Sequence, residues 1–496
     1  MSTRYIVGID QSTQGTKALL LDEKGSCVGM KAVPHRQIIN DKGWVEHDLE
    51  EIARNVIEAV KGVLAETRVD PGTVAGVGVA NQRETIALWD RNGGRPVYNA
   101  IVWQCNRGAR ICERIEQEGA AEEVRERTGL KLSPYFSAAK LAWILEQVPG
   151  TRERAERGEL VCGTMESWVI YRLTKGKACK TDYSNASRTQ MFNIHTMSWD
   201  EEVCRIFGIP MACLPEVCDS DAQFGETDFD GLLPAPVPIH AAFGDSHCSL
   251  FAHNCHDRGT AMTGYGTGSC VLFNIGDRPI LSRHGVSTSV GWRIGGKTVY
   301  VFDGVINYSG AVITWLLKDV GLISSPQESE ALARAANKGD TTYLVPAFSG
   351  IGAPYWKSDI AAAFTGMTRL TGRAELVKAA LESIAYQIAD VIEAMSADAG
   401  FPLVEMRVSG APAQNGYLMQ FQSDLIGCPV LVPEFEELSA MGAAYAAGFA
   451  LGMYTRDHIT ANNRYRTIRP NISEQERMAK WSGWKRAVRM LTENQS

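Results

Sequence analysis

Two short apolar runs, each interrupted by a polar turn, stand out first along the chain. Residues 5–9 and 17–22 flank a turn rich in Ser, Thr and Gly. Residues 260–263 and 270–274 flank a second turn of the same kind at 264–269. Runs of β-forming residues on either side of such a turn are typical of a β-hairpin. One predicted hairpin opens each half of the chain, which indicates a duplicated plan with a cleft between the halves.

A helical pattern and a buried strand follow the first hairpin. Apolar side chains recur with helical spacing across 52–63, after Asp48 as N-cap and Glu51 three residues later. This pattern predicts a helix over 48–64. Residues 74–80 form a continuous apolar run that predicts a buried strand, and the polar residues 81–84 end it.

The second half alternates helices and strands. The pattern predicts a helix over 374–397, a strand over 404–408, a turn over 409–415 and a helix over 416–425. A strand, a glycine turn and a helix N-terminus in series can present backbone N–H groups to an anion or a nucleotide. The alternation predicts an α/β fold. The proline-rich stretch 234–238 places the domain boundary shortly after it, giving domains 1–250 and 251–496.

Composition narrows the class of protein. The chain has 496 residues, of which 45% are hydrophobic and 22% charged, so disorder, collagen and coiled coil are excluded as its main character. A net charge of −7 argues against a general nucleic-acid partner. The 12 cysteines form no CxxC pair and are expected to be reduced thiols of a cytoplasmic protein. We expect no signal peptide and no membrane segment, because the apolar stretch 443–453 is about half a bilayer span.

The two glycine-rich turns are candidates for phosphate binding. The chain has no GxxxxGK[ST] motif, so a P-loop is excluded. Turns rich in Gly, Ser and Thr offer hydroxyls and closely approaching N–H groups to phosphate oxygens instead. Asp10, at the mouth of the first hairpin, can hold Mg²⁺, which prefers one or two carboxylates together with phosphates.

Longer stretches resemble the FGGY carbohydrate kinases, and within that family the glycerol kinases. Residues 135–147 (YFSAAKLAWILEQ) and 362–382 match two family signatures, and the resemblance runs from about residue 4 to 490. Shorter glycerol-kinase-like stretches lie at 43–48, 81–85, 103–105, 182–189 and 352–356. The resemblance implies two actin-like, ribonuclease-H-like ATPase domains of α/β class with a catalytic cleft between them. It also implies ATP and Mg²⁺ as cofactors and a homodimer or homotetramer.

The resemblance implies a role for each matching residue. The first phosphate loop would be formed by Asp10, which approaches Mg²⁺, and by Gln11, Ser12 and Thr13. The second phosphate loop would be formed by Gly266, Thr267 and Gly268, and the adenosine would be bordered by Gly410, Ala411 and Asn415. The polyol would be surrounded by Arg83, Glu84, Trp103, Tyr135, Asp245 and Ser246, with Asp245 as the general base.

These roles agree with the chemistry of phosphoryl transfer, although each residue also has a structural alternative. A hydroxyl nucleophile needs a carboxylate within hydrogen-bond reach, and closure of the cleft would limit wasteful ATP hydrolysis. Against this, Asp245 and Asn415 can be helix caps, and Arg83 with Glu84 can be a surface ion pair. Trp103 and Tyr135 can be core aromatics.

The chain departs from the glycerol-kinase pattern near the acceptor. Ser246 and His247 follow the predicted base where those kinases have two glutamines, and Cys270 replaces a phenylalanine. The first loop is also closer to the sugar-kinase form. Because the changes to Cys and Ser remove volume, we predict a pocket enlarged on one side. It would favour a tetritol, a pentitol or a ketopentose over glycerol, although glycerol is the first acceptor that the resemblance implies.

Three other interpretations compete with this one. A dehydrogenase is excluded because no GxGxxG follows the first strand, and a non-catalytic nucleotide-binding protein is disfavoured by Asp10 and Asp245. Five possible zinc ligands lie within ten residues: His247, Cys248, His253, Cys255 and His256. Their spacing fits no usual zinc finger, so we expect buried cysteines and surface histidines there rather than a metal site.

Overall fold

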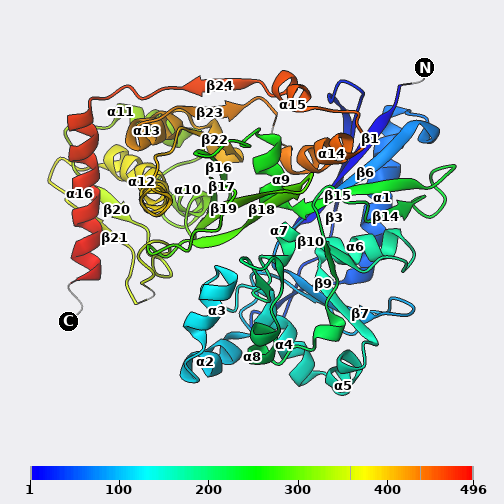
Figure 1. Ribbon diagram of the computed structural model, residues 1–496. Helices are drawn as coiled ribbons and strands as arrows, with labels where there is room; N and C mark the ends of the chain where they lie inside the picture. The colour runs from blue at the N-terminus through cyan, green and yellow to red at the C-terminus, as the bar shows by residue number, and fades with distance from the viewer. Residues whose placement is uncertain (1–2, 358, 436, 494–496) are drawn as a thin grey trace.

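Two mixed β-sheets form the centres of the two halves of the molecule (Figure 1). The computed structural model describes residues 3–357, 359–435 and 437–493. Within these residues the first sheet has six strands in the order β14-β15-β6-β1-β2-β3, and the second has seven in the order β18-β19-β17-β16-β22-β23-β24. The first sheet consists of β1 (Tyr5–Gln11), β2 (Gly15–Leu21), β3 (Cys27–Pro34), β6 (Val74–Asn81), β14 (Gly225–Thr227) and β15 (Val237–Gly244). The second consists of β16 (Thr260–Tyr265), β17 (Ser269–Gly276), β18 (Ser287–Ile294), β19 (Lys297–Ile306), β22 (Glu405–Ser409), β23 (Val430–Pro433) and β24 (Tyr465–Ile468).

A third, smaller sheet and several strand pairs complete the β-structure. The third sheet contains β4 (Ile38–Ile39), β5 (Val45–His47), β8 (Ala100–Ile101), β7 (Ile86–Asp90) and β9 (Leu160–Thr164). The pairs are β10 (Lys180–Asp182) with β13 (Glu216–Cys218), β11 (Phe192–Asn193) with β12 (Ser198–Trp199), and β20 (Tyr343–Val345) with β21 (Ala363–Thr365).

Helices surround the sheets on both halves (Figure 1). Those before residue 260 are α1 (Leu49–Thr67), α2 (Ala109–Gln117), α3 (Ala121–Thr128), α4 (Ser137–Gln147), α5 (Thr151–Glu156), α6 (Met165–Leu173), α7 (Tyr183–Ala186), α8 (Glu201–Phe207) and α9 (Asp245–Ala252). Those after it are α10 (Gly310–Lys318), α11 (Glu328–Ala335), α12 (Arg373–Ala399), α13 (Gly416–Ile426), α14 (Leu438–Ala450), α15 (Arg456–Asn462) and α16 (Glu474–Thr492). Short 3-10 turns lie at Pro71–Thr73, Met211–Cys213 and Ala411–Gln414.

The same five-strand arrangement occurs in both sheets. In β3-β2-β1-β6-β15, the first three strands are antiparallel and β6 and β15 run parallel to β1. In β19-β17-β16-β22-β23 the directions repeat strand for strand. Both predicted hairpins are therefore confirmed, and so is the duplicated plan that they indicated.

The first predicted helix is confirmed as α1. Its start differs from the predicted pattern in the partner of the Glu51 side chain. Asp48 is the N-cap, and its Oδ1 accepts hydrogen bonds from the N–H groups of Glu50 and Glu51 at 2.8 and 3.1 Å. The Glu51 carboxylate accepts hydrogen bonds from the backbone N–H and Nε of Arg36. This acidic side chain therefore ties the helix start to the segment after β3.

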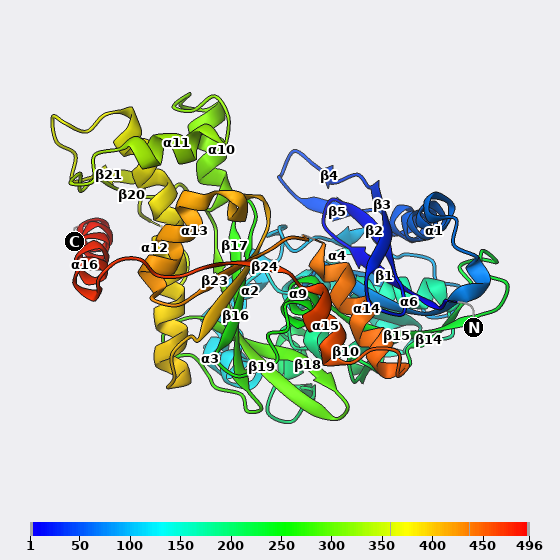
Figure 2. The same ribbon diagram turned by 90° about the horizontal axis from the view of Figure 1, so that it is seen from above.

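Helix α14 comes late in the chain but packs on the first sheet and on α9, beside β1 and β2 (Figure 2). A Cβ atom at Gly442 would lie 2.0 Å from the carbonyl oxygen of Cys248, and one at Gly78 would lie 2.1 Å from that of Ala443. Only glycine fits such approaches, so Gly442 and Gly78 allow the close packing of α14 on α9 and on the first sheet. The division into 1–250 and 251–496 stays a prediction, because this helix of the second half packs on the sheet of the first.

In the described part of the chain, all 12 cysteines are free thiols. Across the same residues, no helix combines the length and the apolar character needed to cross a membrane.

Candidate active site

The parallel strands β1, β6 and β15 end at one edge of the first sheet and bring several predicted site residues together there. The register pairs Gln11 with Asn81 and Asn81 with Gly244. Asp10 therefore lies at the end of β1, Arg83 and Glu84 follow β6, and Asp245 begins α9 directly after β15. The carboxyl ends of parallel strands are the usual place for ligands in α/β proteins.

Asp245 occupies a polar place at the start of α9. Its Oδ1 accepts hydrogen bonds from the backbone N–H of Ser246 at 2.6 Å and from Ser246 Oγ at 3.1 Å, and it lies 3.7 Å from Arg83 Nε. Its side chain is 31% exposed. Removal from water raises the pKa of Asp245, and Arg83 and the Ser246 N–H oppose this shift. The carboxylate is thus accessible and basic, as a proton acceptor requires.

A buried cluster of four charged side chains lies beside Asp245. Arg83 Nη1 donates to Asp303 Oδ2 at 2.6 Å, and Arg188 Nη1 lies 3.1 Å from the same oxygen. Arg188 Nε donates to Glu84 Oε1 at 2.6 Å. Burial alone would raise the pKa of Asp303, but Arg188 and Arg83 hold it well below its usual range. The alternative of a surface ion pair for Arg83 and Glu84 is wrong, since both side chains are buried.

Arg188 and Asp303 were not predicted as site residues, although a feature of the sequence could have indicated each of them. Arg188 lies within the stretch 182–189 that resembles the glycerol kinases. Asp303 is a single carboxylate in the buried strand β19. A charge within such an apolar run needs a partner, and this need alone makes the aspartate a candidate for a site.

Trp103 and Tyr135 line a cavity of about 910 Å³. Their rings meet edge to face at 5.7 Å, and Trp103 Nε1 donates to Thr13 Oγ1 of the first loop at 3.0 Å. Arg188 and Asp303 line the same cavity, so two of the predicted acceptor residues share it with the charged cluster, whereas Arg83, Glu84 and Asp245 are not among the described residues that line it.

Cys270 and Ser246 are not among the described residues that line this cavity. Cys270 Sγ donates to Asp303 Oδ1 at 3.3 Å and accepts a hydrogen bond from Arg83 Nη2 at 3.5 Å. The thiol is therefore held within the charged cluster. The predicted preference for a larger acceptor stays a prediction.

Lys140 supports the backbone that carries Tyr135. Its ammonium group is fully buried and donates to the carbonyl oxygens of Tyr135 and Phe136. Burial lowers the pKa of Lys140 to about 7, against the attraction of Glu84. Between pH 7 and 10 the unfolded chain therefore binds a proton that the folded chain has lost, so stability rises with pH across this interval.

We expect Lys140→Met to flatten this rise. The measurement is the free energy of unfolding in urea at pH 7 and pH 9, with Lys338→Met, at an exposed position, as the control. An unchanged difference between the two pH values in Lys140→Met would contradict the assignment of the rise to Lys140.

The second glycine turn, Gly266, Thr267 and Gly268, packs against the start of α10. Gly266 N–H donates to the Gly268 carbonyl at 2.8 Å, and the Thr267 carbonyl accepts from the N–H of Ser309 at 3.0 Å. A Cβ atom at Gly268 would lie 2.3 Å from the Ile306 carbonyl oxygen, so this position requires glycine.

Buried polar atoms without a hydrogen-bond partner gather at the two turns. Among the described residues they include Asp10 Oδ1 and Thr16 Oγ1 in the first hairpin, and Ser269 Oγ and Ser309 Oγ at the second turn. Such atoms in a native site indicate a place for a polar ligand or water. The serines were not predicted as site residues from sequence.

The turn predicted to border adenosine adjoins the second glycine turn. Gly410 has φ 94°, and a Cβ atom there would lie 2.0 Å from the Tyr265 carbonyl oxygen. Ala411 begins the 3-10 turn that follows. Asn415 caps α13: its Oδ1 accepts from the N–H of Leu418 at 3.0 Å, and its Nδ2 donates to Ser329 Oγ at 3.2 Å. Asn415 is thus a helix cap, and its contact with adenosine stays a prediction.

Asp10 fits a divalent cation. Burial and the neighbouring Asp245 together raise its pKa to about 7, and Lys17 opposes this shift only in part. A buried carboxylate next to a second carboxylate calls for a positive charge, which Mg²⁺ bound to phosphates would supply.

The five possible zinc ligands are not brought together into one group among the described residues. Cys248 and Cys255 are buried as expected, but the expectation of surface histidines is wrong, because His247 and His253 are fully buried. His253 Nδ1 lies 3.1 Å from the Tyr465 hydroxyl. Across the described residues, no group of three or more His, Cys, Asp or Glu could hold a metal ion.

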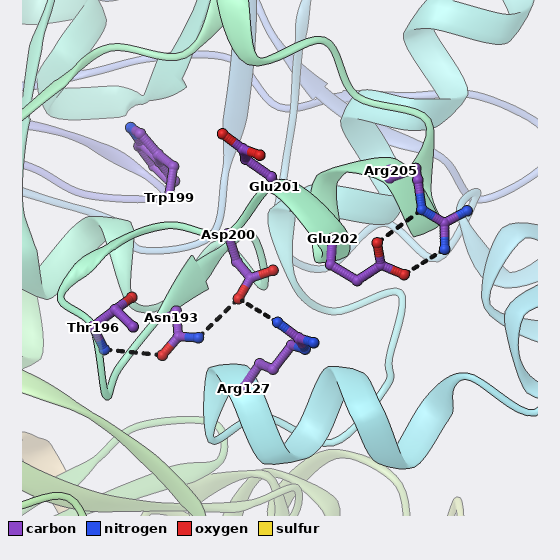
Figure 3. A pocket seen from close by; sticks show the side chains of 8 residues that line it. All are labelled: Arg127, Asn193, Thr196, Trp199, Asp200, Glu201, Glu202 and Arg205. Atoms are coloured by element: carbon purple, nitrogen blue, oxygen red, sulfur yellow. Dashed lines mark hydrogen bonds and ion pairs between the residues drawn. The ribbon is translucent and has the colours of Figure 1, made fainter.

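A second hollow, of about 510 Å³, lies between α3 and α8 (Figure 3). Asp200 caps α8 and accepts hydrogen bonds from Asn193 Nδ2 at 2.8 Å and Arg127 Nη1 at 3.3 Å. Arg205 pairs with Glu202 on the same helix (Figure 3). Because these charged side chains cap a helix or pair with one another, we assign this hollow no chemistry.

Comparison with known proteins agrees with this geometry. Residues 5–252 match the N-terminal domain of the FGGY family of carbohydrate kinases, and residues 261–451 match its C-terminal domain. The chain is 45% identical to glycerol kinase 1 of Thermotoga maritima, covering 98% of this chain and 99% of that protein. It is 43% identical to the glycerol kinase of Halalkalibacterium halodurans, covering 99% of each. The structure of Plasmodium falciparum glycerol kinase with ADP superposes with a TM-score of 0.93 at 32% identity, covering 99% of this chain and 98% of that one.

Proposed function

The chain belongs to the FGGY family of carbohydrate kinases, and we propose that it transfers the terminal phosphoryl group of ATP to a terminal hydroxyl of glycerol, giving glycerol 3-phosphate. Its fold is the predicted pair of actin-like ATPase domains, and it is a phosphotransferase with an alcohol acceptor. One observation carries the choice of glycerol: several glycerol kinases are 41–45% identical to this chain over nearly its whole length.

In this proposal the acceptor hydroxyl lies between Asp245 and the charged cluster. Asp245 takes the proton of the attacking hydroxyl, since its carboxylate is accessible and its pKa is raised. Arg83 donates to, and Glu84 accepts from, the neighbouring hydroxyls of the polyol. Trp103 covers the C–H side of the carbon chain, and closure of the halves keeps water from the phosphoryl group.

The nucleotide would be held by the two glycine-rich turns. Gln11, Ser12 and Thr13 would contact phosphates from the first half, and Gly266, Thr267 and Gly268 from the second. Gly410, Ala411 and Asn415 would border the adenosine. Asp10 would hold Mg²⁺, which when bound neutralises charge on the phosphates. The partnerless Asp10 Oδ1 supports this assignment.

We also propose a cytoplasmic homodimer or homotetramer, acting on a small molecule and not on nucleic acid or membrane. The free thiols support a reducing compartment. Sedimentation equilibrium of the purified chain measures the oligomeric state.

The acceptor is tested by ADP release with Mg-ATP. Glycerol is compared with erythritol, threitol, arabitol, xylitol, xylulose and ribulose at matched concentrations. A lead for glycerol of about a hundredfold in kcat/KM, roughly 2.7 kcal/mol of transition-state binding, supports the proposal. If a four- or five-carbon acceptor gives the highest kcat/KM, that acceptor replaces glycerol in the proposal. If no acceptor is phosphorylated, the kinase assignment is contradicted.

A further inference from the structure

A single carboxylate of the second half holds two guanidinium groups of the first half. Asp303 lies on β19, and its Oδ2 is 2.6 Å from Arg83 Nη1 and 3.1 Å from Arg188 Nη1. Its Oδ1 accepts a hydrogen bond from Cys270 Sγ at 3.3 Å. Both oxygens are therefore engaged, and the side chain is inaccessible to solvent. Asp303 nevertheless lines the cavity that contains Trp103 and Tyr135.

The charges of this cluster balance only when Asp303 is counted. Arg83 and Arg188 carry two positive charges, and Glu84 and Asp303 carry two negative charges. Asp245 stands outside this balance, with its Oδ1 3.7 Å from Arg83 Nε, beyond ordinary hydrogen-bond length.

Without the Asp303 carboxylate, Arg83 would have two nearby anions left, Glu84 and Asp245. Glu84 already accepts a hydrogen bond from Arg188 Nε at 2.6 Å, so Asp245, 3.7 Å from Arg83 Nε, is the one for Arg83 to approach. A direct bidentate pair between the two would occupy the carboxylate that must accept the hydroxyl proton. It would also turn the guanidinium away from the acceptor. Asp303 therefore fixes the position of Arg83 between the two aspartates.

We propose that Asp303 is a positioning residue for the acceptor: it holds Arg83 toward the polyol and keeps this side chain from closing on Asp245. The inference rests on the proposed function, because it assigns Arg83 to the polyol. It also explains why both halves contribute to the acceptor site, since Asp303 and Arg83 come from opposite halves and meet only when the halves are together.

The test compares Asp303→Asn and Asp303→Glu with a matched control, Asp390→Asn. Asp390 is also a buried, ion-paired aspartate, on α12. It accepts hydrogen bonds from the Tyr355 hydroxyl at 2.8 Å and Trp484 Nε1 at 2.7 Å, and lies 2.6 Å from Lys485 Nζ. The measurements are kcat, the KM for the acceptor, the KM for ATP and the thermal unfolding midpoint. The acceptor is the one of the panel that the unaltered chain uses best.

We expect Asp303→Asn to raise the acceptor KM by about tenfold or more, while the KM for ATP changes by less than about twofold. Asp303→Glu keeps the charge and should recover part of the loss. Asp390→Asn should lower the unfolding midpoint and leave both KM values unchanged, as a purely structural aspartate would.

The inference is overturned if Asp303→Asn lowers the unfolding midpoint like Asp390→Asn but leaves the acceptor KM unchanged. It is also overturned if both KM values rise together. Should Asp303→Asn not fold, Asp303→Glu decides by the same split, and a rise in the KM for ATP as large as the rise in the acceptor KM counts against the inference. Failure of the unaltered chain to use any acceptor would overturn the proposed function and this inference together. Normal turnover with an unchanged acceptor KM in the variants would overturn the inference alone.

Discussion

Asp245→Asn is expected to lower kcat by about a hundredfold to ten-thousandfold, the range that a lost general base usually costs. The amide has the same shape as the carboxylate but cannot take the proton of the attacking hydroxyl. The fold should survive, because Asp245 is partly exposed and the α9 start keeps its other contacts. The KM for ATP should change little, since Asp245 acts on the acceptor.

The control for this prediction is Ser246→Ala. It removes the Oγ donor at 3.1 Å but leaves the N–H donor at 2.6 Å on Asp245 Oδ1. A loss of one of two hydrogen bonds should cost about tenfold or less in kcat. Single-turnover measurements of phosphorylated product separate the chemical step from product release. A kcat for Asp245→Asn within tenfold of the unaltered chain would contradict the role of Asp245 as base.

Local patterns in the sequence predicted the parts of the fold that local interactions determine. The hairpins around Asp10 and Gly266 were predictable because apolar runs and glycine turns each span only a few neighbouring residues. The start of α1 at Asp48 was predictable for the same reason. The family, the fold class and the class of reaction were confirmed, because the signatures at 135–147 and 362–382 are long. The roles of the site residues stay predictions.

The charged cluster was only half predictable, because its members are far apart in the sequence. Arg83 and Glu84 are neighbours in a recognisable stretch, whereas Asp303 is 220 residues from Arg83. Whether a charge is paired and buried depends on which strand faces it, and the facing strand cannot be inferred from composition. The same limit explains the error at His247, where the helix α9 turns the imidazole inward.

A second large effect is expected for Asp10→Asn, which should lower kcat/KM by about a hundredfold or more. The reason is the loss of several kcal/mol of charge stabilisation that a bound cation supplies to the phosphates. The same substitution should make the protein without Mg²⁺ more stable at pH 8. At this pH the Asp10 carboxylate is ionised while buried beside Asp245, which disfavours the folded state.

The direction of this pH dependence follows from the pKa of Asp10. Burial raises this pKa from 3.8 to about 7, so between these values the folded chain holds a proton that the unfolded chain has released. The contribution of Asp10 to stability therefore falls as pH rises through this interval. Asparagine carries no charge, so its advantage should be small at pH 4 and greatest at pH 8.

The measurement is urea unfolding of both proteins at pH 4 and pH 8, in EDTA and in Mg²⁺. Mg²⁺ should narrow the difference at pH 8, because a ligand that binds the folded state stabilises the unaltered chain. Asp41→Asn, in an exposed loop, is the control and should show neither effect. A gain in stability together with lost activity would mean that Asp10 is kept for catalysis at the expense of the fold. A loss of stability at pH 8 without Mg²⁺ would instead mean that Asp10 has a stabilising partner in the folded chain, and the cation assignment would be wrong.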